Sequence, residues 1–330
     1  MHIFTNPNYD FLRWRWQAIA LSWVIILAGI ANIAMNGIAK GVEFAGGTVV
    51  ITQFDQAPSI QQVRGALDQS FPGGGQNLVV QTYGDSTQRQ VMVRIPEVGA
   101  ESGASLSTTA QTVVDALTKA NLGDFKVVGT EIVGPAVGRE LTSKGIWATV
   151  LSLCGILLYI AFRYRLSFAV GAVVATLHDL LVTLAFLTFF RYDLSLNVIA
   201  AILTVTGYST NDTIVIFDRV RENLRSMRRD SLNHVVNLSI NQTLGRTVIT
   251  AGTTLLTAIA LFLFGGDVLR GFAFTLIVGV VTGTYSSVFV AATVVTFWRD
   301  KAPARAAATA PATSPQPARR SKPQRKVRAS

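Results

Sequence analysis

An acidic residue inside an apolar stretch is the most informative chemical feature of this chain. Asp212 stands between Asn211 and Thr213 in the segment Gly207–Arg219, with apolar residues on both sides of the cluster. An ionisable side chain in a bilayer costs roughly 2.5–3.5 kcal/mol on insertion scales, so it rarely persists without a task or a partner. This cluster therefore indicates a functional helix rather than a plain membrane anchor.

Arg246 is the candidate partner of this carboxylate. Burial favours the protonated form of an aspartate and a nearby cation favours the ionised form, so a basic neighbour can poise the group between them. Asp212 lies about six residues, or roughly 9 Å, inside the end of its span. Arg246 begins the next span on the same side. The pair suits a proton path, and the alternative is a static ion pair that only joins two helices.

A second polar pair, His178 and Asp179, lies near the middle of another apolar span. Adjacent helical residues point about 100° apart, so both side chains cannot face one partner equally. A proton-relay or gating role and a structural hydrogen bond both fit this placement. A metal site is disfavoured because an apolar span offers no further ligands.

The elements that must position these residues are membrane spans. The chain is 50% hydrophobic and 15% charged, whereas a soluble domain carries about 25% charged residues. Its apolar residues gather into runs near or above the roughly 18 residues that mark a membrane helix. We therefore expect an α-helical membrane protein with six transmembrane helices, at about 16–39, 145–162, 166–190, 194–217, 247–264 and 270–297.

Basic residues set the expected orientation of these helices. They gather in the N-terminal segment 1–15, between spans 2 and 3, in the loop 218–246 and in the tail 299–330. All four places fall on one side of a six-span arrangement, which puts both termini in the cytoplasm. The net charge of +10 is thus attributed to membrane orientation and not to nucleic-acid binding.

Two of these basic segments have further expected properties. Segment 218–246 mixes arginines with apolar residues and reads as amphipathic helices along the cytoplasmic interface. The tail 299–330 is rich in Ala, Pro, Arg and Lys, so we expect it to be disordered and to contact anionic lipids. The alternative for the tail is a solubilising segment that only sets topology.

The long segment 40–144 is expected to form a separate exterior domain, with the five later spans in 145–298. Its residue periodicity alternates between strand and helix, in the order β-α-β-β-α-β of a ferredoxin-like fold. Ser59 is the expected N-cap of the first helix. The expected elements are Thr48–Phe54, Ser59–Phe71, Asn77–Tyr83, Arg89–Ile95, Ser105–Asn121 and Phe125–Ile132.

Glycines mark both joints between this domain and the spans. Gly46 and Gly47 follow span 1, and Gly134 and Gly138 precede span 2. Glycine reaches backbone conformations that other residues avoid, so these positions are candidate hinges. Ordinary tight turns are the alternative.

Six motifs, taken in order, resemble those of the SecF family of protein-export membrane subunits, within the SecD/SecF family and the RND superfamily. Glu43, beside Phe44, stands where the family usually has Asp, and Ala251 stands where Ser is usual. The resemblance covers about residues 1–298. The motifs are Gly41–Gly47, Val133–Gly138, His178–Asp179, Gly207–Thr213 with Asp218–Asn223, Arg246–Leu255 and Gly283–Ser287.

The resemblance implies an RND-type half, in the bacterial plasma (inner) membrane, that pairs with a larger SecD subunit. It implies association with the SecYEG translocon, with YajC- and YidC-type proteins as further candidate partners. Its implied task is to draw unfolded exported polypeptides across the membrane after the ATP-driven stage. The implied energy source is the proton-motive force, with no cofactor. Asp212 and Arg246 match the family's proton-path residues.

Two other functions stay open. The first is half of an RND-type exporter of a lipid or small molecule, a class that usually carries two six-span units in one chain. The second is a passive scaffold that stabilises the translocon. An enzyme is not expected, because the sequence has no H-E-x-x-H, no G-x-S-x-G elbow and no P-loop.

Overall fold

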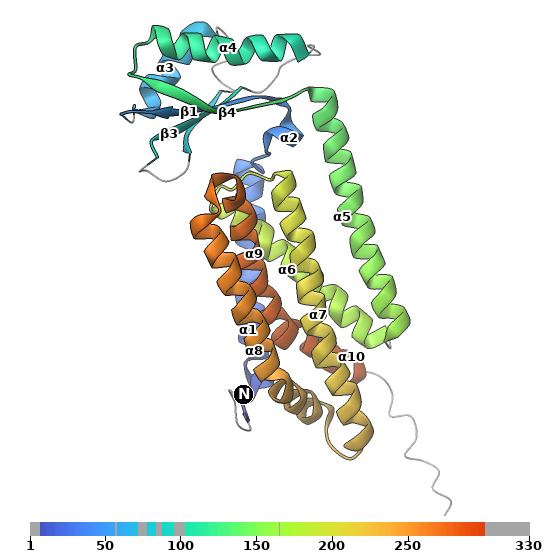
Figure 1. Ribbon diagram of the computed structural model, residues 1–330. Helices are drawn as coiled ribbons and strands as arrows, with labels where there is room; N and C mark the ends of the chain where they lie inside the picture. The colour runs from blue at the N-terminus through green and yellow to red at the C-terminus, as the bar shows by residue number, and fades with distance from the viewer. Residues whose placement is uncertain are drawn as a thin grey trace, which may run out of the picture.

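The computed structural model describes residues 7–56, 58–71, 78–83, 88–95, 103–164 and 166–300. A small α+β domain sits at one end of a bundle of long helices (Figure 1). After a short 3-10 helix at Phe11–Trp14, the bundle consists of α1 (Arg15–Asn36), α5 (Pro135–Arg163), α6 (Leu166–Phe189), α7 (Leu196–Ser226), α8 (Leu232–Phe264) and α9 (Gly266–Ser286). Helix α9 continues through the π-helical segment η2 (Ser287–Ala291) into α10 (Ala292–Asp300).

Five helical stretches of the described chain are long and apolar enough to cross a membrane. They coincide with five of the six expected spans, although α5 and α8 begin well before the expected first residues. Helix α7 runs beside the others (Figure 1) but is not among the five, because its hydroxyl, amide and charged residues lower its hydropathy. The five stretches are Phe11–Asn36, Ala136–Arg163, Leu166–Phe189, Leu232–Phe264 and Val268–Phe297.

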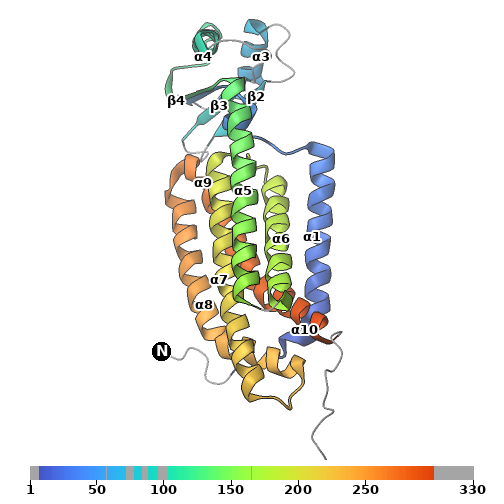
Figure 2. The same ribbon diagram turned by 90° about the vertical axis from the view of Figure 1, so that its right-hand side faces the viewer.

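The helices divide into an inner and an outer set. Helices α6, α7 and α9 pack against one another, and their facing side chains are buried. Helix α5 lies at the outside of the bundle in Figure 1, and helix α1 does so in Figure 2. Large apolar side chains on α1, α5 and α8 are exposed, which suits contact with lipid or with another membrane protein. Examples are Trp23, Leu27, Trp147, Leu158, Leu256 and Leu263.

The expected bounds of the loop 218–246 differ from the structure. Helix α7 continues to Ser226 and α8 begins at Leu232, so only residues 227–231 lie between them. The segment is helical, as expected, and its apolar residues Val220, Val236 and Ile240 join the main core of the bundle. Its place at a membrane interface stays a prediction. Hydropathy marks where apolar residues lie and does not mark where a helix ends.

The exterior domain is a four-stranded antiparallel sheet with two helices on one face (Figure 1). Its sheet order is β2-β3-β1-β4, and β1 pairs with β3 and β4. A core that includes Val50, Val93 and Leu117 fills the space between sheet and helices. The elements are β1 (Gly47–Phe54), α3 (Ile60–Ser70), β2 (Val79–Tyr83), β3 (Gln90–Ile95), α4 (Gly103–Lys119) and β4 (Phe125–Val133).

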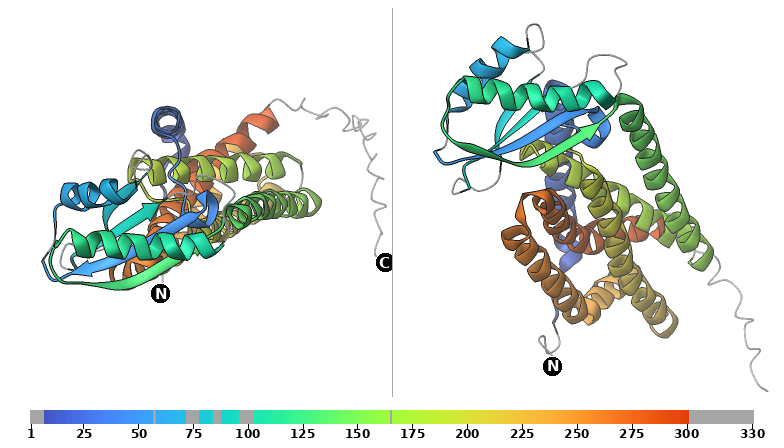
Figure 3. Two further views of the ribbon diagram at one scale, coloured as in Figure 1. Left: turned by 90° about the horizontal axis from the view of Figure 1, so that it is seen from above. Right: turned by 45° about the horizontal axis from the view of Figure 1, so that its top comes forward.

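The order of elements in this domain confirms the sequence prediction. Each strand and helix overlaps its expected range, with ends that differ by about two residues, as is usual. Ser59 caps α3 through the backbone N–H of Gln62, whose side chain reaches back to Ser59, so the capping prediction is confirmed. One face of the sheet packs on the helices (Figure 3), and Val49 and Met92 of the central strands are buried in a separate cluster.

The two joints use their glycines differently. Gly46 and Gly47 adopt φ values of 72° and 120°, which other residues rarely reach, just after the short helix α2 (Val42–Ala45). At Gly138 a Cβ would lie 3.2 Å from the backbone N of Gly46 and 3.3 Å from the carbonyl O of Phe44. A Cβ at Gly134 would have no neighbouring atom within 4 Å. The joint is therefore a close backbone contact between α2 and α5.

We expect Gly138→Val to destabilise the protein by about 1–3 kcal/mol, because its side chain must push two backbone segments apart. The measurement is thermal unfolding in detergent, followed by circular dichroism. Gly155→Val on the same helix is the control, because a Cβ there meets nothing within 4 Å. Equal stability of the two variants would contradict the close contact.

Candidate functional site

Two carboxylates lie in the packed interior of the helix bundle. Asp179 on α6 is 2% exposed and Asp212 on α7 is 6% exposed. Polar groups at membrane depth have no water to bond, so neighbouring helices must supply their partners. The groups around these two side chains therefore define the candidate site.

Asp212 is held by hydroxyl groups from two other segments. Thr247 on α8 donates to its Oδ1 at 2.7 Å. Ser287, the first residue of η2, donates to its Oδ2 at 2.6 Å. These lengths are typical of hydroxyl bonds to a carboxylate. Neutral donors thus orient the carboxylate from both sides without bringing a fixed charge.

Arg246 does not form the expected ion pair. Among the ion pairs of the described residues, none joins Arg246 to Asp212. Its side chain is exposed, although its charge lies near enough to act on Asp212 through space. The expectation fails because adjacent helical residues point about 100° apart, and Thr247 takes the inward position.

The two residues beside Asp212 also point in different directions. Thr213 is 1% exposed and belongs to the buried face of α7. Asn211 is exposed on the opposite side of the same turn. The polar cluster read from the sequence is therefore split between the interior of the bundle and its surface, and only Asp212 and Thr213 lie inside.

His178 and Asp179 bond to each other. His178 Nδ1 and Asp179 Oδ1 are 3.0 Å apart, and the imidazole stacks on Tyr285. Asp179 Oδ2 accepts hydrogen bonds from Ser209 on α7 and, at 2.8 Å, from Ser286 on α9. The two side chains thus form a hydrogen bond, and the choice between a structural and a relay role stays a prediction. The part of the chain that the structure describes contains no group of three or more His, Cys, Asp or Glu that could hold a metal ion.

Sequence reasoning missed most of the hydroxyl partners. Ser209, Ser286 and Ser287 contact the carboxylates, yet a serine in an apolar run is equally typical of helix packing. The available signal was the run Gly283–Ser287, whose glycine lets α7 come close. A Cβ on Gly283 would lie 2.9 Å from the Cβ of Ser209.

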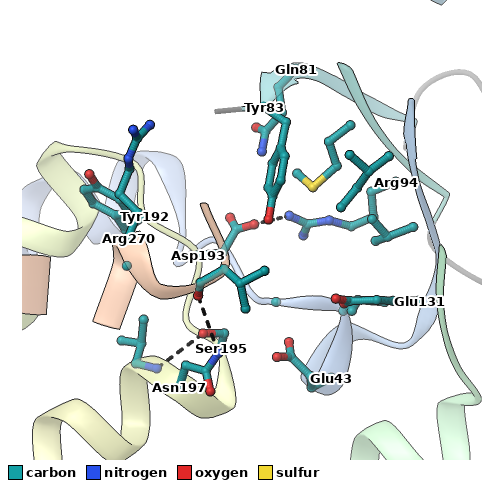
Figure 4. A pocket seen from close by; sticks show the side chains of 18 of the residues that line it. Glu43, Gln81, Tyr83, Arg94, Glu131, Tyr192, Asp193, Ser195, Asn197 and Arg270 are labelled. Atoms are coloured by element: carbon teal, nitrogen blue, oxygen red, sulfur yellow. Dashed lines mark hydrogen bonds and ion pairs between the residues drawn. The ribbon is translucent and has the colours of Figure 1, made fainter. Parts of the chain in front are cut away.

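A second polar region lies between the exterior domain and the helix bundle. A cavity of about 430 Å³ opens there, and Figure 4 shows Arg94 of β3 directed at Asp193 of the α6–α7 loop. These two side chains form an ion pair, and Arg94 also donates to the carbonyl of Lys40. The backbones of residues 39–41 and Leu194 exchange two hydrogen bonds of 2.7 Å. The exterior domain is thus attached to the loop between the two carboxylate-bearing helices.

Acidic and basic side chains line this cavity in equal number: Glu43, Glu131 and Asp193 against Arg94, Arg191 and Arg270. Glu43, named by its motif, and Glu131 on β4 point into the same space (Figure 4). Burial raises the pKa of Asp193, and Glu43 adds to this rise while Arg94 opposes it. Burial and the neighbouring Glu43 also raise the pKa of Glu131.

The fold and the site together define a class of protein. Several membrane-length helices enclose two buried carboxylates, and an α+β domain attached to the α6–α7 loop stands at one end of the bundle. This is a multi-pass membrane protein with an ionisable centre, a combination that marks ion or proton pathways in membrane proteins.

Comparison with known proteins identifies the family. Residues 112–301 match the family described as protein export membrane protein SecD/SecF, C-terminal. Protein translocase subunit SecF of Desulfurispirillum indicum is 41% identical over 88% of this chain and 92% of its own. The SecF subunit of Escherichia coli O157:H7 is 38% identical over 86% and 85%. The chain therefore belongs to the SecF family of protein translocase subunits, which are multi-pass proteins of the bacterial inner membrane.

Solved structures agree with this assignment. The crystal structure of SecDF, a translocon-associated membrane protein from Thermus thermophilus, superposes with a TM-score of 0.79 at 32% identity. SecDF in its super-membrane-facing form gives a TM-score of 0.65 at the same identity. Each match covers 90% of this chain but only 39% of the SecDF chain.

We expect acid to strengthen attachment of the exterior domain. A carboxyl whose pKa is raised in the attached state binds protons more tightly there than in the detached state. Its contribution to the free energy of attachment is therefore full below its ordinary pKa and is lost as pH rises through the raised value. Spin-label distances between the exterior domain and α6 should therefore narrow in distribution from neutral to acidic pH. Glu131→Gln should weaken this dependence, and a distribution that broadens in acid would contradict it.

Proposed function

We propose that this chain is a proton-driven subunit of the Sec protein translocase that works with a SecD-like partner. Support comes from the SecF relatives and from the SecDF likeness, in which this chain matches 39% of a longer protein. The remainder of that longer protein corresponds to the proposed partner. Exposed apolar faces on α1, α5 and α8 are suited to contact it.

The observation that carries the proposal is the environment of Asp212. A carboxylate placed only to join two helices would be expected beside a fixed cation, since charges at membrane depth are usually paired. Asp212 is instead held by Thr247 and Ser287, and hydroxyls can donate to a carboxylate or accept from a carboxyl group. Both protonation states therefore find partners, as a proton-carrying group requires.

A mechanical connection from this centre to the exterior domain supports the same function. Helices α6 and α7 carry Asp179 and Asp212, and the loop between them bears Asp193 and Leu194. These loop residues contact Arg94 and residues 39–41. A relative movement of α6 and α7 would thus be transmitted to the exterior domain, where an unfolded exported polypeptide would be held.

The finer architecture belongs to this proposal. Helix α7 is the fourth of six membrane spans, the exterior domain is ferredoxin-like by its sheet order β2-β3-β1-β4, and both termini are cytoplasmic. The SecYEG translocon, YajC- or YidC-type proteins and anionic lipids are the proposed further partners. The tail expected to bind lipid lies, from residue 301 onward, outside the described residues. The proton gradient drives the work, with neither enzymatic activity nor a cofactor.

The test is gradient-dependent export into membrane vesicles that contain this chain, its SecD-like partner and the translocon. We expect Asp212→Asn to reduce export to the level seen without a proton gradient, because the amide keeps the shape of the side chain but cannot take up a proton. Asp230→Asn is the matched control, since Asp230 is exposed in the α7–α8 turn. Co-purification of the partner and translocon checks assembly.

Two outcomes would overturn the proposal. Undiminished export by Asp212→Asn would make Asp212 structural and favour a passive scaffold. Gradient-driven release of a lipid or small molecule, with no effect on export, would favour an RND-type exporter.

A further inference from the structure

Two consecutive serines connect the two buried carboxylates. Ser286 donates to Asp179 Oδ2 at 2.8 Å, and Ser287 donates to Asp212 Oδ2 at 2.6 Å. Both serines are 0% exposed. The carboxylates lie on different helices, α6 and α7, and this single pair on α9 and η2 contacts both.

Each serine also has a second acceptor within its own helix. Ser286 Oγ lies 3.2 Å from the carbonyl O of Gly283, and Ser287 Oγ lies 2.9 Å from that of Thr284. A hydroxyl carries one hydrogen, so it donates to only one acceptor at a time. The hydroxyl hydrogen of each serine can therefore take two orientations, one toward the carboxylate and one toward the helix carbonyl.

These two orientations match the two protonation states of an aspartate. An ionised carboxylate accepts the serine hydrogen. When a proton from the aqueous phase binds Oδ2, the new O–H donates to the serine Oγ, and the serine hydrogen turns to the helix carbonyl. Every donor keeps an acceptor in both states, which avoids the cost of an unsatisfied buried group.

The helix changes its own hydrogen bonding at this pair. Helix α9 ends at Ser286, and the π-helical segment begins at Ser287. A π segment widens one turn by a residue, and such segments are frequent at functional sites. The serine pair therefore lies where a small change in helix register moves both hydroxyls together.

We propose that Ser286 and Ser287 are positioning residues that couple the protonation of Asp179 to that of Asp212 through their shared turn. This inference rests on the proposed function, because it names how the proton-carrying centre works. When one serine turns away from its carboxylate, the α9–η2 turn changes. The hydrogen bond between the other serine and its own carboxylate then changes as well. The two carboxylates then respond to the gradient as one unit rather than separately.

The experiment is a pH titration of the Asp212 carboxyl band by infrared difference spectroscopy. It uses this chain with its SecD-like partner in lipid, and Asp212→Asn assigns the band. Ser286→Ala is the test variant, because Ser286 bonds Asp179 and not Asp212. Thr275→Ala is the matched control, because Thr275 is a buried hydroxyl on the same helix α9 that bonds the carbonyl of Gly271 and neither carboxylate.

We expect Ser286→Ala to move the titration midpoint of Asp212 by about half a pH unit or more, the scale of one hydrogen bond. Thr275→Ala should leave it in place, because Thr275 contacts neither carboxylate. Equal shifts in both variants, a shift in neither, or a shift with Thr275→Ala alone would each overturn the coupling.

The titration and the export assay separate the two proposals. If Asp212→Asn exports normally, the proposed function fails, whatever the titration shows about the serines. If Asp212→Asn loses export while Ser286→Ala leaves the Asp212 titration unmoved, the coupling alone is wrong.

Discussion

The need to satisfy buried carboxylates inside a membrane is the constraint on which the rest of this structure depends. Asp179 and Asp212 are almost fully buried, and each requires donors that only a neighbouring helix can bring. Hydroxyls on α7, α8 and the α9–η2 junction meet this need. Small residues such as Gly279 and Gly283 let α9 come close enough to α7 for these short side chains to reach.

The same constraint determines where the exterior domain is attached. The loop between α6 and α7 is short and joins the two carboxylate-bearing helices. Asp193 and Leu194 in this loop bind Arg94 and the segment that leaves α1, while Gly138 packs α5 against α2 on the other side of the joint. The small domain is thus connected to the helices that would move as well as to the outer helices α1 and α5.

Sequence reasoning succeeded where one residue type stood out against its surroundings. A charge in an apolar run identified Asp179 and Asp212, and alternating periodicity identified the exterior domain. It failed where the outcome depends on helix phase or on contacts between distant helices. Arg246 was expected to face inward, but Thr247 does so. Ser287 lies in the motif Gly283–Ser287, but its carboxylate partner depends on how distant helices pack and could not be derived from the sequence. Helices α7 and α8 extend past their apolar runs for the same reason, since tertiary packing continues them.

Proton flux is the most direct test of the central claim that the hydroxyl-held Asp212 takes up and releases protons. The chain and its SecD-like partner would be placed in liposomes with a pH-sensitive dye inside, and an acid pulse would be applied outside. Our account predicts inward proton movement in the wild type that Asp212→Asn abolishes and Asp230→Asn preserves. Equal flux through the wild type and Asp212→Asn would contradict it.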